Sequence, residues 1–479
     1  MIGQAGATFA QEAPLSAIDW LSNSIAVPDK LAEPAEPDPV QVPPVITVSP
    51  LDRAVPDRAG LIDARDLGVP PGLWGRSAAA DLAAMIAELP DTSDAPPALR
   101  VFLRDLMVAR LVPPVDAASD QSLYLARIDK LLAMGHLSAA NDLIKAAGAP
   151  EPQRFRRAFD IALLTGTVAE ACRVIEETPE ISPTYPARVF CLARNGKWDV
   201  AALTLGNAGS LVILTPDEDK LLLIFLDAEL FENEPVPRPP RVPSPLMFRI
   251  YEAIGERIPT DQLPVAFATA DISNTVGWQA RLRAVEHLAA SGAVPADRLV
   301  QIYSVRRAAA SGGIWDRVGA VRAAADALKV GNEQDVTDTL PAAWRFAKEA
   351  GYEPGFAYWA ADQLDGIALK GAARHVAFEI ALLAWDAELA AQVVGTSGED
   401  RFLLALAQGQ GGAEPGNDPL SRAVLRGLGA LEPAKRYKAL IDDDRAGEAL
   451  LQAYAALSEV ATGNPAAVTD ALSALRTLI

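Results

Sequence analysis

One pattern of glycine, bulky apolar residue and alanine occurs three times between residues 121 and 215. A large apolar side chain stands two positions after each glycine, an alanine stands five positions after it, and consecutive glycines are about 30 residues apart. The three sets are Gly135, Leu137 and Ala140; Gly166, Val168 and Ala171; and Gly196, Trp198 and Ala201. A repeat of this length predicts a helix-turn-helix unit that buries its apolar face by stacking on its neighbours.

The pattern resembles the second half of the tetratricopeptide repeat, in which a further alanine and a proline follow. Ala147 and Ala208 occupy the further alanine position, whereas Thr178 departs from it. The period is also shorter than the roughly 34 residues of that family. The resemblance covers about residues 121–215 and implies an α-solenoid of antiparallel helix pairs.

The same resemblance implies a concave groove lined by residues of the first helix of each pair. The groove positions are Leu125, Asp129, Arg156, Asp160 and Phe190. Such a surface binds another protein or peptide through charged and apolar contacts. The alternative, that these are ordinary solvent-facing side chains, stays open at this point.

Composition favours an all-α fold and argues against nucleic acid as a partner and against a membrane-spanning helix. Half of the residues are hydrophobic but only 6% are aromatic, and alanine and leucine, which both favour helix, dominate the apolar content. The net charge of −19 makes nucleic acid an improbable partner because the phosphate backbone is repelled. No apolar run approaches the roughly 18 residues of a membrane span.

The amino-terminal segment suggests export. Residues 1–14 contain Ala-Thr-Phe-Ala before Gln11, which resembles the end of a signal peptide that has lost its beginning. A periplasmic location is therefore expected, with a cytoplasmic one as the alternative. Residues 15–60 comprise a short amphipathic helix and a proline-rich, disordered linker, and this tethered helix either contacts a partner or folds back onto the body.

A second proline-rich stretch divides the rest of the chain. Residues 233–245 are predicted to link a helical repeat domain over 61–232 to a second one over 246–479. Long helices are expected in the second domain, among them 371–395 and 433–459.

No residue set predicts a reaction, a cofactor or a metal site. The chain has three histidines and lacks the Cys-x-x-Cys and His-Glu-x-x-His patterns of zinc sites. Its glycine-rich stretch, Gly409 to Gly416, lacks the Lys-Ser or Lys-Thr ending of a phosphate-binding loop. Cys172 and Cys191 could approach one another across packed helices, but buried unpaired thiols are the favoured interpretation.

The sequence as a whole predicts a non-enzymatic, helical repeat scaffold that binds another protein. We expect it in a bacterial cell-envelope assembly, such as the flagellar motility or a secretion apparatus, by analogy of architecture alone. The alternative is an α/α-toroid enzyme acting on envelope polysaccharide, which needs two carboxylates roughly 5 to 9.5 Å apart in a deep pocket.

Overall fold

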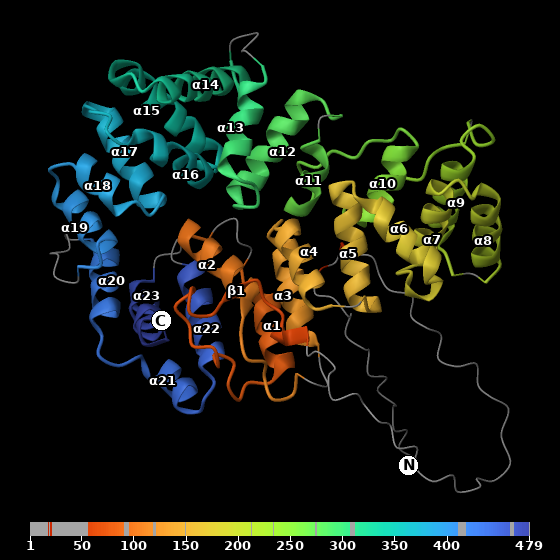
Figure 1. The fold of residues 1–479 in the computed structure, drawn as a ribbon, viewed down its shortest axis with the longest axis horizontal. Coiled ribbons are helices and arrows are strands. Elements are labelled where there is room, and N and C mark those ends of the chain that lie inside the picture. Colours follow the sequence, from red (N-terminus) through yellow and green to blue (C-terminus); the bar gives the residue numbers. More distant parts are fainter. Residues whose placement is uncertain are drawn as a thin grey trace, which may run out of the picture.

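The protein folds into an all-α structure, shown by a computed structural model (Figure 1). The structure describes residues 18, 20–21, 56–90, 95–117, 121–148, 150–211, 213–232, 234–273, 275–306, 312–410, 418–459 and 464–478. In these ranges the chain forms twenty-three α-helices, three short 3-10 helices and two strands of two residues each, so the all-α prediction is confirmed. The predicted signal segment 1–14 and most of 15–60 lie outside the described residues.

The amino-terminal half begins with two helices and a small parallel strand pair. The elements are η1 (Pro56–Arg58), β1 (Ile62–Asp63), α1 (Ala79–Glu88), α2 (Pro97–Val108) and β2 (Ala109–Arg110). The Arg127 guanidinium fixes this pair to the first repeat by donating to the backbone oxygens of Met107 and Ala109 on one side and of Asp57 and Ala59 on the other. Complete burial lowers the pKa of Arg127 to about 10.

Three helix hairpins follow at the positions of the repeated pattern. They are α3 (Ser122–Ala133) with α4 (Leu137–Ala146), α5 (Pro152–Thr165) with α6 (Val168–Glu177), and α7 (Tyr185–Arg194) with α8 (Trp198–Ser210), with η2 (Pro179–Ile181) between α6 and α7. The corner glycines Gly135, Gly166 and Gly196 share the left-handed conformation, with φ of 81°, 77° and 76°. Glycine adopts it without a steric penalty, and each helix contacts the next in sequence from α3 to α9.

The remaining helices complete the chain. They are α9 (Pro216–Leu226), α10 (Pro245–Ala253), η3 (Val265–Phe267), α11 (Ala268–Asp271), α12 (Trp278–Ala290), α13 (Ala296–Ser304), α14 (Ile314–Val330), α15 (Glu333–Ala350), α16 (Glu353–Leu364), α17 (Gly371–Leu383), α18 (Ala387–Val393), α19 (Gly398–Ala407), α20 (Pro419–Gly429), α21 (Lys435–Asp442), α22 (Ala446–Ser458) and α23 (Pro465–Leu478). Among the described residues, no helix combines the length and apolar character needed to cross a membrane.

Two predicted long helices are wrong because each is broken in the middle. The expected helix 371–395 is divided into α17 and α18 at Trp385, and the expected helix 433–459 into α21 and α22 at Asp444. Both residues have positive φ, 62° and 58°, and they turn the chain where glycine turns it elsewhere.

The chain follows a curved path that returns to its beginning. Figure 1 shows α22 beside α1 and α2, and the contacts between these helices confirm the arrangement. The closure involves the backbone, since Gly447 N–H donates to Leu73 O and Arg76 N–H donates to Asp444 O, both at 2.8 Å. Side chains of α1, α3, α22 and α23 share one hydrophobic core.

The hydrophobic cores do not divide at the predicted linker 233–245. One core joins residues of α5 to α9 with Leu246 and Ile250 of α10, which follows that linker. Another joins the first repeat to Phe248 and Phe267. Trp20, from the predicted tethered helix, is buried in this core with its ring 5.4 Å from that of Phe267, so this part of the segment contacts the body.

Candidate protein-interaction surface

Large apolar side chains are exposed together on α8, on α9 and in the segments that follow each helix. They are between 36 and 73% exposed, and we call them the α8–α9 surface: Trp198, Val200, Leu203, Leu211, Ile213, Leu223 and Leu230. Scattered exposed apolar residues are normal on proteins, but a concentration of them on two neighbouring helices makes this surface a candidate interaction site.

The position of α8 explains the exposure. Its buried face, formed by Ala201, Leu205 and Ala208, packs in the core that α8 shares with α7 and α9. The opposite face carries Val200 and Leu203 but meets no further hairpin among the described residues, because the chain turns back through α9 and α10 at this point (Figure 1). A repeat helix therefore keeps the apolar face that another repeat would cover.

A groove of about 530 Å³ runs between α8 and α9. On the α8 side it is lined by small residues, including Ala202, Gly206 and Gly209, and on the other side by Leu223 and Leu230. A Cβ atom added at Gly206 would meet nothing within 4 Å, so the floor of the groove is open. Small residues let another helix approach the α8 backbone closely.

Two of the residues that line this groove, Asp219 and Asp227, are acidic. Residues 216–234 contain seven acids: Asp217, Glu218, Asp219, Asp227, Glu229, Glu232 and Glu234. The single basic residue of the stretch, Lys220, forms an ion pair with Glu234 at 2.9 Å. An apolar groove with these acidic residues complements an amphipathic helix whose apolar side is flanked by lysine or arginine.

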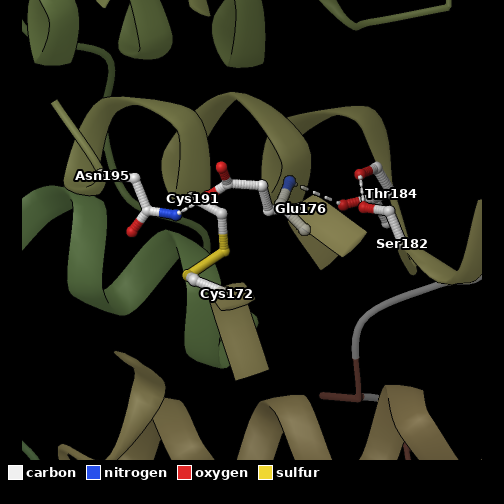
Figure 2. The surroundings of a disulfide bond; sticks show 7 residues. Cys172, Glu176, Ser182, Thr184, Cys191 and Asn195 are labelled. Atoms are coloured by element: carbon white, nitrogen blue, oxygen red, sulfur yellow. Dashed lines mark hydrogen bonds between the residues drawn. A yellow bond between two sulfur atoms is a disulfide. The ribbon is translucent and has the colours of Figure 1, made fainter. Parts of the chain in front are cut away.

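A disulfide between Cys172 and Cys191 fixes the hairpin that carries this surface. Figure 2 shows the bond joining α6 to α7, the second helix of one hairpin to the first helix of the next, across a Cα–Cα distance of 5.0 Å. Asn195 donates to Glu176 beside it at 2.7 Å, and Lys197 pairs with the same carboxylate. The expectation of two unpaired thiols is therefore wrong, because the packed helices bring both sulfur atoms into bonding distance.

The predicted groove residues occupy a different environment from the one expected. Asp129, Arg156, Asp160 and Phe190 are at most 5% exposed, and Leu125 packs partly buried against the core. They are therefore packing positions, and four of the five are closed to a peptide in this structure.

Contacts between the hairpins account for this burial. Arg157 of α5 donates to both carboxylate oxygens of Asp129 on α3, at 2.5 and 2.6 Å. Phe190 stacks on Phe225 of α9, with ring centroids 5.7 Å apart. The repeat-defining residues Leu137, Ala140, Val168 and Ala201 are buried as expected, whereas Trp198 belongs to the α8–α9 surface.

The described part of the chain contains no group of three histidine, cysteine, aspartate or glutamate side chains arranged to hold a metal ion. His136 lies buried at the corner of the first hairpin, and burial lowers its pKa to about 4. Burial also lowers the pKa of His287. Both imidazoles are therefore neutral near pH 7.

Comparison of the chain with protein-family models, curated proteins and solved structures gives no match. The evidence for the candidate surface therefore comes from the structure of this chain.

Proposed function

We propose that the protein is a non-enzymatic scaffold that binds another protein at the α8–α9 surface. The observation that carries this proposal is the group of seven large apolar side chains left exposed beside an open groove. The water-exposed apolar area favours association, since burying it releases roughly 25 cal/mol for each Å². Burial of Leu203 and Leu230 by a partner supplies that gain.

The repeat architecture supports a scaffold role. In this proposal the three hairpins, whose corner glycines share one conformation, begin a tetratricopeptide-like solenoid, and the exposed face of the last hairpin is available to a partner. The partner is then an amphipathic helix with basic residues beside its apolar stripe, because Asp219 and Asp227 line the groove and five more acids lie in the same segment, residues 216–234.

The disulfide supports export to an oxidising compartment such as the bacterial periplasm. Disulfides persist in such compartments and are rare in the reducing cytosol. An exported helical scaffold suits a cell-envelope assembly, and a motility or secretion apparatus is the kind of assembly that we propose, by analogy of architecture.

Binding of a designed peptide to the full chain tests the surface directly. The probe is a fluorescein-labelled amphipathic helix with leucine on one face and lysine on the other. The control peptide has glutamate in place of each lysine. Fluorescence anisotropy is expected to give at least about tenfold tighter binding for the lysine peptide, with an advantage that shrinks at high salt.

Two variants distinguish peptide binding at this surface from non-specific binding elsewhere on the protein. Leu203→Glu places a charge on the exposed face of α8 and is expected to weaken binding at least about tenfold. Leu431→Glu changes a side chain that is 95% exposed elsewhere on the molecule and should leave binding unchanged. Equal affinities of wild type and Leu203→Glu would remove the basis of the proposal.

The physiological partner can be captured by a photo-crosslinking residue at position 203, with position 431 as the control. Support requires that the captured protein carry a basic amphipathic helix and that this purified helix bind wild type better than Leu203→Glu. A captured helix that binds both forms equally would contradict the assignment.

A further inference from the structure

A second cavity, of about 980 Å³, lies between the segment 257–263, the start of α12 and the start of α14. Among the residues that the structure describes, it is lined by four arginines, Arg241, Arg257, Arg283 and Arg306, but by only two acids, Asp261 and Asp271. This excess of positive charge is unusual in a chain whose net charge is −19. We infer that the cavity binds an acidic oligosaccharide, a sugar chain that carries carboxylate groups.

Three of the arginines are available to a ligand. Arg257 forms an ion pair with Asp271 at 2.7 Å, and Thr260 donates to the other oxygen of that carboxylate at 2.7 Å, so this pair forms part of the wall. The other three side chains are exposed and form no ion pair with any residue that the structure describes. A guanidinium group binds a carboxylate through two parallel hydrogen bonds.

An aromatic wall accompanies the positive charge. Trp278 and Trp315 stack with ring centroids 5.1 Å apart and an interplanar angle of 16°. Trp278 is buried and donates through Nε1 to Ile302 O, whereas Trp315 is partly exposed where it borders the cavity. An indole provides a flat apolar surface that suits the C–H face of a sugar ring, while its buried partner keeps it in place.

The polar lining supplies partners for hydroxyl groups. Gln262 and Gln279 both line the cavity, and each amide offers two donors and an acceptor oxygen. A single inorganic anion would use the arginines alone, whereas an acidic sugar uses the arginines, the indole and the amides together. The volume lies at the upper end of the roughly 300 to 1,000 Å³ of small-molecule sites.

Screening allows such a site to function on an acidic protein. At physiological ionic strength, charges farther away than about 8 Å are largely screened, so the nearby arginines dominate the field inside the cavity. Binding should therefore weaken as salt is added.

Isothermal titration of the full chain with a tetrasaccharide of galacturonic acid tests this inference. Neutral maltotetraose, inorganic phosphate and ATP are the comparison ligands. We expect the acidic tetrasaccharide to bind at least about tenfold more tightly than each of the three. Failure of the acidic sugar to bind, or equal binding of phosphate or ATP, would overturn the inference.

Variants locate the binding in this cavity. Arg283→Ala and Trp315→Ala are each expected to weaken binding of the acidic tetrasaccharide at least about tenfold, whereas Arg401→Ala removes an exposed arginine of α19 and should have no effect. Trp315→Phe keeps an aromatic face and should retain most of the affinity if Trp315→Ala fails to fold. Unchanged affinity in Arg283→Ala would place the sugar elsewhere, and so would unchanged affinity in a folded Trp315→Ala protein.

Discussion

The indole of Trp74 lies directly against the backbone of Gly447, where the end of the chain meets its beginning. Trp74 is almost completely buried. Gly447 N–H donates to the carbonyl oxygen of Leu73, the residue before Trp74, at 2.8 Å. A Cβ atom at position 447 would overlap the indole ring. Glycine at this position therefore allows helix α22 to approach the amino-terminal helices as closely as it does.

Gly447→Ala is expected to destabilise the protein. The added methyl group forces the indole or α22 to move, and such overpacking costs about 1 to 3 kcal/mol. Gly429→Ala is the matched control, because it also lies in a helix but a Cβ there meets nothing within 4 Å. Urea denaturation of both variants measures the difference, and equal midpoints would show that the closure tolerates a side chain.

Removal of the disulfide should lower stability. The two cysteines are 19 residues apart in sequence, and closing a loop of that length contributes about 3 kcal/mol in the chain-entropy model. The variant with both Cys172→Ser and Cys191→Ser is therefore expected to unfold at lower temperature, and reductant should lower the melting temperature of wild type alone.

The redox state in cells tests the export proposal as well. Because both cysteines are buried, cells are quenched with acid and the protein is denatured before a thiol-reactive maleimide is added. Both cysteines should then stay unlabelled unless reductant is added first. Complete labelling without reductant would show that the thiols are free and would contradict an oxidising location.

Sequence patterns predicted the helices whose ends carry glycine or proline, and failed where another residue makes the turn. Gly135, Gly166 and Gly196 marked three corners that the structure contains. Trp385 and Asp444 turn the chain in the same left-handed conformation. Tryptophan is not typical of a turn, and aspartate is a weaker turn signal than glycine, so both breaks were missed. The meeting of Trp74 with Gly447 depends on the path of the whole chain, which local periodicity does not encode.

The candidate surface was missed for a related reason. A helical period shows which face of α8 is apolar, but whether another helix covers Leu203 depends on where the row of hairpins ends. The opposite error affected Asp129 and Asp160, which were expected to line an open groove because of their position in the repeat but are buried. For Asp129, a signal was present in the chain, since Arg157 on the next repeat supplies its partner.

The buried ion pair between Asp129 and Arg157 should be costly to break from one side. Asp129→Asn removes the carboxylate charge that accepts two hydrogen bonds from the fully buried Arg157 guanidinium, and breaking a buried ion pair from one side costs about 3 to 5 kcal/mol. Replacing both residues, as Asp129→Leu with Arg157→Met, should cost less than the sum of the single changes. A double-mutant cycle by chemical denaturation measures this coupling, and additive effects would exclude it.

Acid should destabilise the protein in part through His136. Burial, together with the nearby positive charge of Arg104, lowers its pKa to about 4 in the folded state, against about 6.5 when unfolded. Between these values the unfolded chain binds more protons, so the free energy of unfolding falls as the pH decreases. The full contribution, about 3 kcal/mol, is present above pH 6.5 and is lost by pH 4.

Denaturation of wild type and His136→Gln at pH 7 and pH 4 isolates this contribution, because the carboxylates that titrate over the same range are common to both proteins. The variant is expected to lose about 3 kcal/mol less than wild type on acidification, and equal losses would show that His136 is not the group responsible.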